Sequence, residues 1–145
     1  TNVTNALGYT PANKAGDTFS GAVSATTLTA SSGGVTVNTS GYIVTTSYTT
    51  GASTSQVTVD SFATATYRSA KYIAQMTAGS SYHVIKLRIV HDGTSVWMSQ
   101  YGEIYTGSSL GTFDASIATG TLSLLFTPAS ATATTVKLIR ENIVV

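Results

Sequence analysis

Hydrophobic and polar residues alternate along the second half of the chain, and this period of two predicts β-strands. In one such run Ile85, Leu87 and Ile89 share a face, while Lys86 and Arg88 point to the other side. No segment keeps apolar residues at helical spacing over three turns, so no helix is predicted. The predicted strands cover residues 56–62, 67–77, 82–91, 96–106, 113–117, 122–127 and 135–142.

Turn residues separate these runs. Residues 78–81 (AGSS) indicate a hairpin loop, and the pair Asp92-Gly93 lies between two β-rich runs, which is the strongest short-range signal for a hairpin. About seven strands at a spacing of roughly 8–12 residues are typical of a sandwich of two sheets. The predicted fold class is therefore all-β, with an antiparallel β-sandwich domain over residues 55–145 that we expect to fold independently.

Residues 1–54 have a different pattern, because their apolar residues are isolated among Thr, Ser and Gly. The short alternation at 34–38 indicates a strand that buries too little to be stable alone. We predict that residues 1–54 form an extended shaft or attachment segment with short strands. A flexible linker is one interpretation of this segment. From residue 34 onward we favour a second interpretation, in which its side chains meet those of other chains in an intertwined homotrimer. The predicted trimer or shaft contacts are Val35, Val37, Tyr42 and Val44.

The composition narrows the range of possible functions. Charged residues make up 9% of the chain and the net charge is +1, so the basic face that nucleic-acid binding requires is not expected. No apolar run approaches the roughly 20 residues of a membrane-spanning helix, and no membrane insertion is predicted. Thr and Ser fill nearly a third of the chain, and such an uncharged surface suits burial against identical subunits.

The sequence offers few candidates for chemistry. It has no cysteine, and His83 and His91 would lie about 27 Å apart along one strand, so they cannot share a metal ion. We expect each histidine at an edge or surface. Asp92 is predicted to be a turn residue far from Glu103, whereas glycoside hydrolysis needs two carboxyl groups about 5–9 Å apart. We therefore predict no catalytic residue, no metal, no cofactor and no enzymatic activity.

One row of aromatic residues stands out in the run 96–106. Trp97, Tyr101 and Tyr105 are predicted on one strand face, with Ser99 and Glu103 between them. Such a row suits stacking on sugar rings or anchoring a partner, which makes the three rings candidate receptor-binding residues. The other interpretation, which we favour, places the rings in the core, because the chain has only 4 Phe to fill it.

Two segments resemble proteins of tailed bacteriophages. Residues 6–22 (ALGYTPANKAGDTFSGA) resemble a short element of tail fibres and other appendages, in which an LGYTP-like turn precedes a GDT-containing turn and then short strands. The second half resembles a β domain of virion structural proteins of tailed phages, including phages of marine cyanobacteria. That likeness lies in residues 59–62 (VDSF), 69–72 (SAKY), 91–94 (HDGT) and 107–114 (GSSLGTFD).

The resemblance implies a homotrimeric virion protein of the phage tail, made in the host cytoplasm, with a C-terminal domain that contributes to host recognition and adsorption. Its implied partners are other tail or baseplate proteins and a host polysaccharide or outer-membrane protein. An alternative is a purely architectural protein of the baseplate, neck or capsid that never contacts the host. A third candidate, a fragment of a depolymerase, is disfavoured by the short chain and its few carboxylates.

Overall fold

The computed structural model describes residues 27, 29 and 33–145, which form nine strands and no helix. The fibre-like motif at residues 6–22 lies outside the described residues. The strands are β1 (Gly34–Val37), β2 (Gly41–Thr49), β3 (Val57–Ala63), β4 (Tyr67–Ala78), β5 (Ser81–His91), β6 (Val96–Tyr105), β7 (Gly111–Ala118), β8 (Thr121–Pro128) and β9 (Thr135–Val144).

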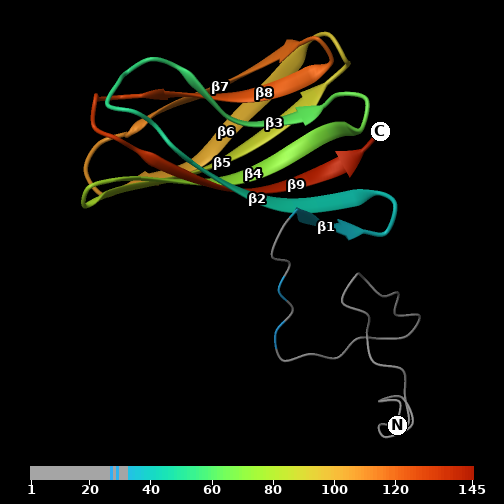
Figure 1. Cartoon of the computed structure of the whole chain (residues 1–145), viewed down its shortest axis with the longest axis horizontal. Helices are drawn as coiled ribbons and strands as arrows, with labels where there is room; N and C mark the ends of the chain where they lie inside the picture. The colour runs from blue at the N-terminus through green and yellow to red at the C-terminus, as the bar shows by residue number, and fades with distance from the viewer. Residues whose placement is uncertain (1–26, 28, 30–32) are drawn as a thin grey trace, which may run out of the picture.

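The strands form two antiparallel sheets that lie one over the other (Figure 1). The larger sheet has six strands in the order β1-β2-β9-β4-β5-β6, and the smaller has three in the order β3-β8-β7. The hairpins β4–β5 and β5–β6 are the two that the turn residues predict. The last strand, β9, lies between β2 and β4, so both ends of the described chain meet in the larger sheet.

The hydrophobic core fills the space between the sheets. Every second side chain of β4, β5 and β9 is buried toward the smaller sheet, as the period of two requires. Tyr72 and Leu87 from the larger sheet and Phe126 from the smaller one are completely buried. The all-β antiparallel fold is confirmed, and each strand predicted beyond residue 55 is present.

The larger sheet extends beyond the predicted domain boundary at its N-terminal side. β2 pairs with β9 along its whole length, from Gly41 opposite Ile143 to Thr49 opposite Thr135. β1 then pairs with β2. Residues 34–49 therefore belong to the larger sheet of the domain, although they lie before the predicted domain boundary after residue 54. Independent folding of residues 55–145 stays a prediction.

The four predicted trimer contacts lie on both faces of this extension. Val35 and Val37 of β1 are exposed to 44% and 52%. Tyr42 and Val44 of β2 are half-buried, and the ring of Tyr42 stacks on that of Tyr67 with centroids 5.5 Å apart. Part of the apolar surface of β2 is thus covered within the chain, and a trimer contact stays a prediction for all four residues.

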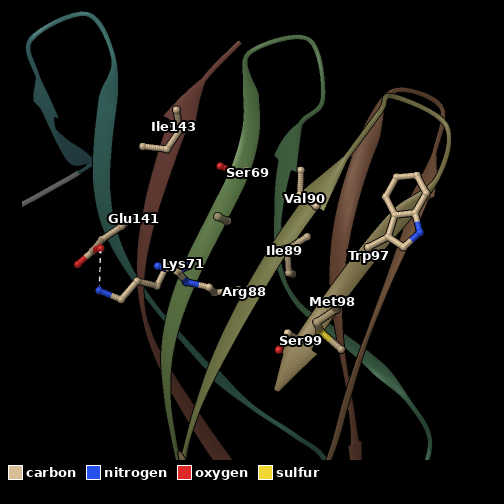
Figure 2. A pocket seen from close by; sticks show the side chains of 11 residues that line it. Ser69, Lys71, Arg88, Ile89, Val90, Trp97, Met98, Ser99, Glu141 and Ile143 are labelled. Carbon is tan, nitrogen blue, oxygen red and sulfur yellow. Dashed lines mark hydrogen bonds and ion pairs between the residues drawn. The ribbon is translucent and has the colours of Figure 1, made fainter. Parts of the chain in front are cut away.

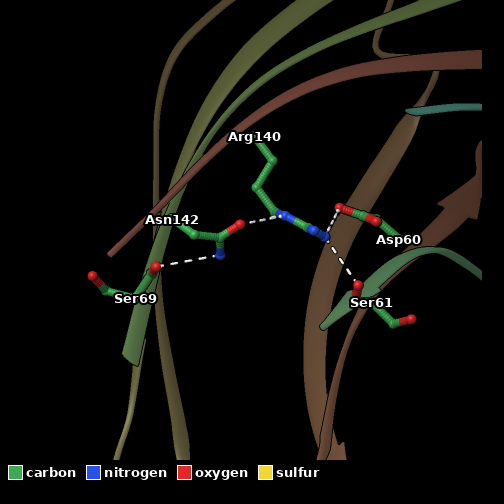
Figure 3. A network of polar contacts seen from close by, with 5 residues as sticks. All are labelled: Asp60, Ser61, Ser69, Arg140 and Asn142. Atoms are coloured by element: carbon green, nitrogen blue, oxygen red, sulfur yellow. Dashed lines mark hydrogen bonds and ion pairs between the residues drawn. The ribbon is translucent and has the colours of Figure 1, made fainter. Parts of the chain in front are cut away.

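A buried polar network connects the two sheets (Figure 3). Arg140 of β9 donates Nη1–H to Oδ2 of Asp60 on β3 at 2.6 Å and to the carbonyl oxygen of Ser61 at 3.0 Å. Its Nε donates to Oδ1 of Asn142 at 2.7 Å, and Asn142 Nδ2 lies 3.4 Å from the carbonyl oxygen of Ser69. The guanidinium and the carboxylate are both more than nine-tenths buried, so each depends on the other for compensation of its charge.

Two aromatic residues, Phe62 and Tyr72, lie close to this ion pair. The Arg140 guanidinium lies 5.3 Å from the ring centroid of Phe62, a distance suited to a cation–π contact. Burial, together with the nearby charge of Asp60, raises the pKa of the Tyr72 hydroxyl well above its usual range. Tyr72 therefore stays neutral in the folded protein.

Candidate functional site

The larger sheet turns one face to the core and the other to solvent, and we call the second the outer face. Scattered exposed apolar residues are ordinary on protein surfaces, whereas a set that shares one face marks an interaction surface. All six strands contribute large exposed hydrophobic side chains to the outer face. They are Val35, Val37, Ile43, Ile73, Tyr82, Val90, Trp97, Tyr101, Ile104, Ile139 and Ile143.

Two of the three predicted aromatic residues lie on this outer face. Trp97 is opposite Val90, and Tyr101 is opposite Lys86 in the β5–β6 pairing. Trp97 is 57% exposed and Tyr101 40% exposed, so the favoured interpretation that placed these rings in the core is wrong. The core is instead filled from the other strands, with Phe126 and Tyr72 among its largest side chains.

Tyr105 does not share the face of the other two rings. The β5–β6 register shifts between Val84 and Lys86, so that Gly102 and Glu103 together face a single position of β5. Gly102 has φ +66°, the left-handed conformation that such a bulge favours for glycine. The extra residue reverses the alternation, and Tyr105 lies opposite the buried His83, with their rings edge to face and 5.5 Å between centroids.

A hollow of about 580 Å³ opens on the outer face beside Trp97 (Figure 2). This volume is within the usual range for small-ligand pockets. Two cross-strand rows form its floor. One row runs Glu141, Lys71, Arg88, Ser99, and the next runs Ile143, Ser69, Val90, Trp97, in each case across β9, β4, β5 and β6.

Positive charge collects on the outer face. Lys71, Lys86, Arg88 and Lys137 all lie there, and Glu141 is the single acidic residue that the described part of the chain places on this face. Lys71 Nζ is 3.1 Å from Glu141 Oε2, an exposed ion pair that neutralises one of the four cations. Sequence inspection identified the polar face of the run 82–91, but only the strand register places Arg88 next to Lys71 and near Trp97.

A second hollow, of about 490 Å³, lies on the same outer face over β2, β9 and β4. Ile73, Ile139 and Lys137 are among the residues that line it. It contains no aromatic ring, which separates it chemically from the hollow beside Trp97.

Both histidines point into the protein, which corrects the expectation of an edge or surface position. His83 and His91 are 1% and 2% exposed, because their spacing of eight residues puts them on the same, inward face of β5. His83 Nδ1 accepts the backbone N–H of Leu110, and Nε2 lies 2.9 Å from Glu103 Oε1. Burial lowers the pKa of His83, with a partial opposing effect from Glu103. His91 Nε2 is 2.7 Å from the carbonyl oxygen of Tyr67.

Asp92 is a turn residue, as the sequence predicts. Its Oδ1 accepts the backbone N–H groups of Thr94 and Ser95 at 2.8 and 2.7 Å, and these bonds lower the pKa of the carboxyl group. Within residues 33–145 and the two isolated described positions, no three His, Asp or Glu side chains cluster as a metal site would require. The described part of the chain also has no helix with the length and apolarity to cross a membrane.

Comparison with known proteins gives likenesses at the level of structure alone. No protein-family model matches the chain, and no curated protein matches it. The similar solved structures include three tailspike proteins of Acinetobacter phages.

The tailspike of phage vB_ApiP_P1 aligns with a TM-score of 0.47 and 19% identity over 88% of this chain and 26% of its own. The tailspike gp49 of Acinetobacter baumannii phage Fri1 is described as a capsular polysaccharide depolymerase. It aligns with a TM-score of 0.44 and 19% identity, over 74% of this chain and 19% of its own. The tailspike of A. baumannii phage AM24 aligns with a TM-score of 0.38 and 11% identity, over 70% of this chain and 26% of its own. The chain thus spans about a quarter or less of these proteins.

The prediction that the chain is not an enzyme is contradicted by this comparison, because one of the similar structures is described as a depolymerase. The argument against catalysis relied on the shortness of the chain and its few carboxylates. A sequence of this extent says nothing about acidic residues elsewhere in such a protein.

Proposed function

We propose that this chain forms part of a bacteriophage tail appendage and that its two-sheet domain binds polysaccharide on the host surface. The virion is then its location, and other tail or baseplate proteins are its structural partners. The observation that carries the proposal is the exposed ring of Trp97 beside the hollow on the outer face. The resemblance of residues 6–22 to a fibre element supports the assignment to a tail appendage.

The chemistry of the hollow suits a sugar. An aromatic face stacks on the C–H face of a pyranose ring, while hydroxyl and charged side chains hydrogen-bond its polar edge. Trp97 supplies such a ring, Ser69 and Ser99 supply hydroxyl groups, and Lys71 and Arg88 supply N–H donors. Tyr101, also on the outer face, continues the aromatic surface along β6.

We further propose that the protein is a homotrimer whose contacts include the N-terminal edge of the larger sheet. Val35 and Val37 are exposed on β1 at this edge, and an exposed apolar edge strand favours pairing with another chain. Light scattering on the purified protein is expected to give about three times 14.9 kDa. A monomer at micromolar concentration would contradict the trimer.

The architectural alternative, docking on the baseplate, neck or capsid without host contact, draws on the same apolar face. The two proposals differ in what Trp97 does. In a host-binding domain its ring contacts sugar, whereas in a purely architectural domain the isolated protein binds no bacterial surface.

Replacing Trp97 with alanine tests the proposed function. Because the ring is exposed, the free energy of unfolding should change by no more than about 0.5 kcal/mol. Loss of one stacking ring should weaken binding to host cells roughly 5- to 30-fold. Binding is measured on a panel of bacterial strains with and without capsule.

Ile104→Ala is the matched control, because Ile104 is 72% exposed on the same strand and does not line the hollow. Trp97 is also the only tryptophan of the chain, so its fluorescence reports directly on ligand contact. A wild-type protein that binds no strain of a panel containing its host would support the architectural alternative.

A further inference from the structure

We propose that the hollow beside Trp97 selects an acidic sugar, with the Arg88 guanidinium binding the sugar carboxylate and Trp97 stacking on its ring. This inference rests on the proposed function and adds the chemical class of the ligand. It makes Arg88 the residue that determines specificity.

The first argument is the surplus of positive charge at the hollow. Lys71 and Arg88 are directly opposite each other in the β4–β5 pairing, and like charges at such positions destabilise a sheet. Glu141, the neighbour of Lys71 on its other side, pairs with Lys71 at 3.1 Å. Within the described residues the structure gives Arg88 no ion pair and no side-chain hydrogen bond. A bound anion would supply the missing charge.

The second argument is the position of Arg88 between aromatic rings. Trp97 lies one row away on one side and Tyr101 one row away on the other, both on the adjacent strand β6. Diagonal neighbours across a strand pair are about 7–8 Å apart, which is within reach of long side chains. Figure 2 shows the Arg88 side chain directed toward Lys71. This side chain is exposed, so its rotation brings the guanidinium within reach of a substituent on a sugar stacked on Trp97.

The third argument concerns the kind of anion. Arginine carries a planar fork of N–H donors that matches the two oxygens of a carboxylate. The surroundings of Arg88 are partly apolar, since Val90 and Ile143 border the hollow with exposures of 47% and 57%. A uronic acid, with one carboxylate on an otherwise uncharged ring, fits one cation among apolar and hydroxyl groups.

The experiment titrates the protein of 145 residues with polygalacturonate oligomers and with the same oligomers after reduction of their carboxyl groups. Calorimetry and Trp97 fluorescence are the two readouts, at low and at high salt. The wild type is expected to bind the acidic oligomers at least about tenfold more tightly than the reduced ones, and less tightly at high salt.

Arg88→Gln is expected to abolish this preference, and Arg88→Lys to restore only part of it because an ammonium group cannot form the paired hydrogen bonds. Lys137→Gln is the matched control, since Lys137 is a cation of the same face that lines the second hollow. The control should keep the full preference. An unchanged melting temperature in each variant shows that the fold is intact.

Three results would overturn the inference. Equal affinity for acidic and reduced oligomers removes the selectivity. If Arg88→Gln and Lys137→Gln weaken the preference for acidic oligomers equally, that preference is general electrostatic attraction to the basic face. A change in oligomeric state with Arg88→Gln shows that this part of the face is an interface between copies. If the wild type binds encapsulated cells through Trp97 but shows no preference for acidic oligomers, only this inference fails and the proposed function stands.

Discussion

Replacing Asp60 with alanine is expected to lower the free energy of unfolding by about 3–5 kcal/mol. The substitution leaves the Arg140 guanidinium buried between the sheets without the carboxylate 2.6 Å away that compensates its charge. Chemical denaturation followed by circular dichroism measures the loss. Both partners are almost completely buried, so neither solvent nor salt can replace the missing charge.

Two further variants test the cause of this stability loss. They distinguish the cost of leaving a buried charge without its partner from the cost of breaking an ion pair in general. Glu141→Ala breaks the exposed pair with Lys71, which should cost no more than about 1 kcal/mol. The double replacement Asp60→Leu with Arg140→Met removes both buried charges and should recover much of the stability. Equal costs for Asp60→Ala and Glu141→Ala would contradict the assignment of Asp60–Arg140 as the buried connection between the sheets.

Removing residues 1–54 is expected to lower the melting temperature by about 10 °C or more, whereas removing residues 1–33 should leave it unchanged. The longer deletion takes away β1 and β2 and uncovers the edge of β9 along nine paired residues. It also loses the stacking of Tyr42 on Tyr67 and the burial of Val44, together about 2 kcal/mol.

Calorimetry on the two truncated proteins checks this, and light scattering detects association through the newly exposed edge of β9. The shorter deletion is the control, because every strand of the structure begins after residue 33. If the protein without residues 1–54 melts like the full chain, the sequence boundary is correct and β2 is only an accessory strand.

The sequence by itself determined the strands and two of the hairpins. Both are local properties: the alternation in 82–91 follows from the pleat, and the Asp92-Gly93 pair meets the backbone demands of a tight turn. The lack of helical periodicity likewise excluded helices without any knowledge of contacts. For these reasons the predicted strands beyond residue 55 agree with the structure within a few residues.

The sequence could not determine which face of a strand is buried when both faces carry apolar residues. In β6 the face of Trp97 and Tyr101 and the face of Val96 and Met98 are similarly hydrophobic. Only the pairing with β5, whose inward face is fixed by the Ile85, Leu87 and Ile89 side chains, directs Trp97 to solvent. The choice depends on a neighbour, so no local pattern contains it.

Tertiary structure also decided the details on which the candidate site depends. The bulge at Gly102 shifts the register by one residue and separates Tyr105 from the other two rings, because a one-residue shift moves a side chain to the opposite face. The insertion of β9 between β2 and β4 brings Glu141 to Lys71 and Arg140 to Asp60, pairs that are 70 and 80 residues apart in the chain. Strand order in a sheet is a long-range property, set by how the two layers bury their apolar faces together. The sequence supplied the strands, and their packing placed Arg88 and Trp97 beside one hollow.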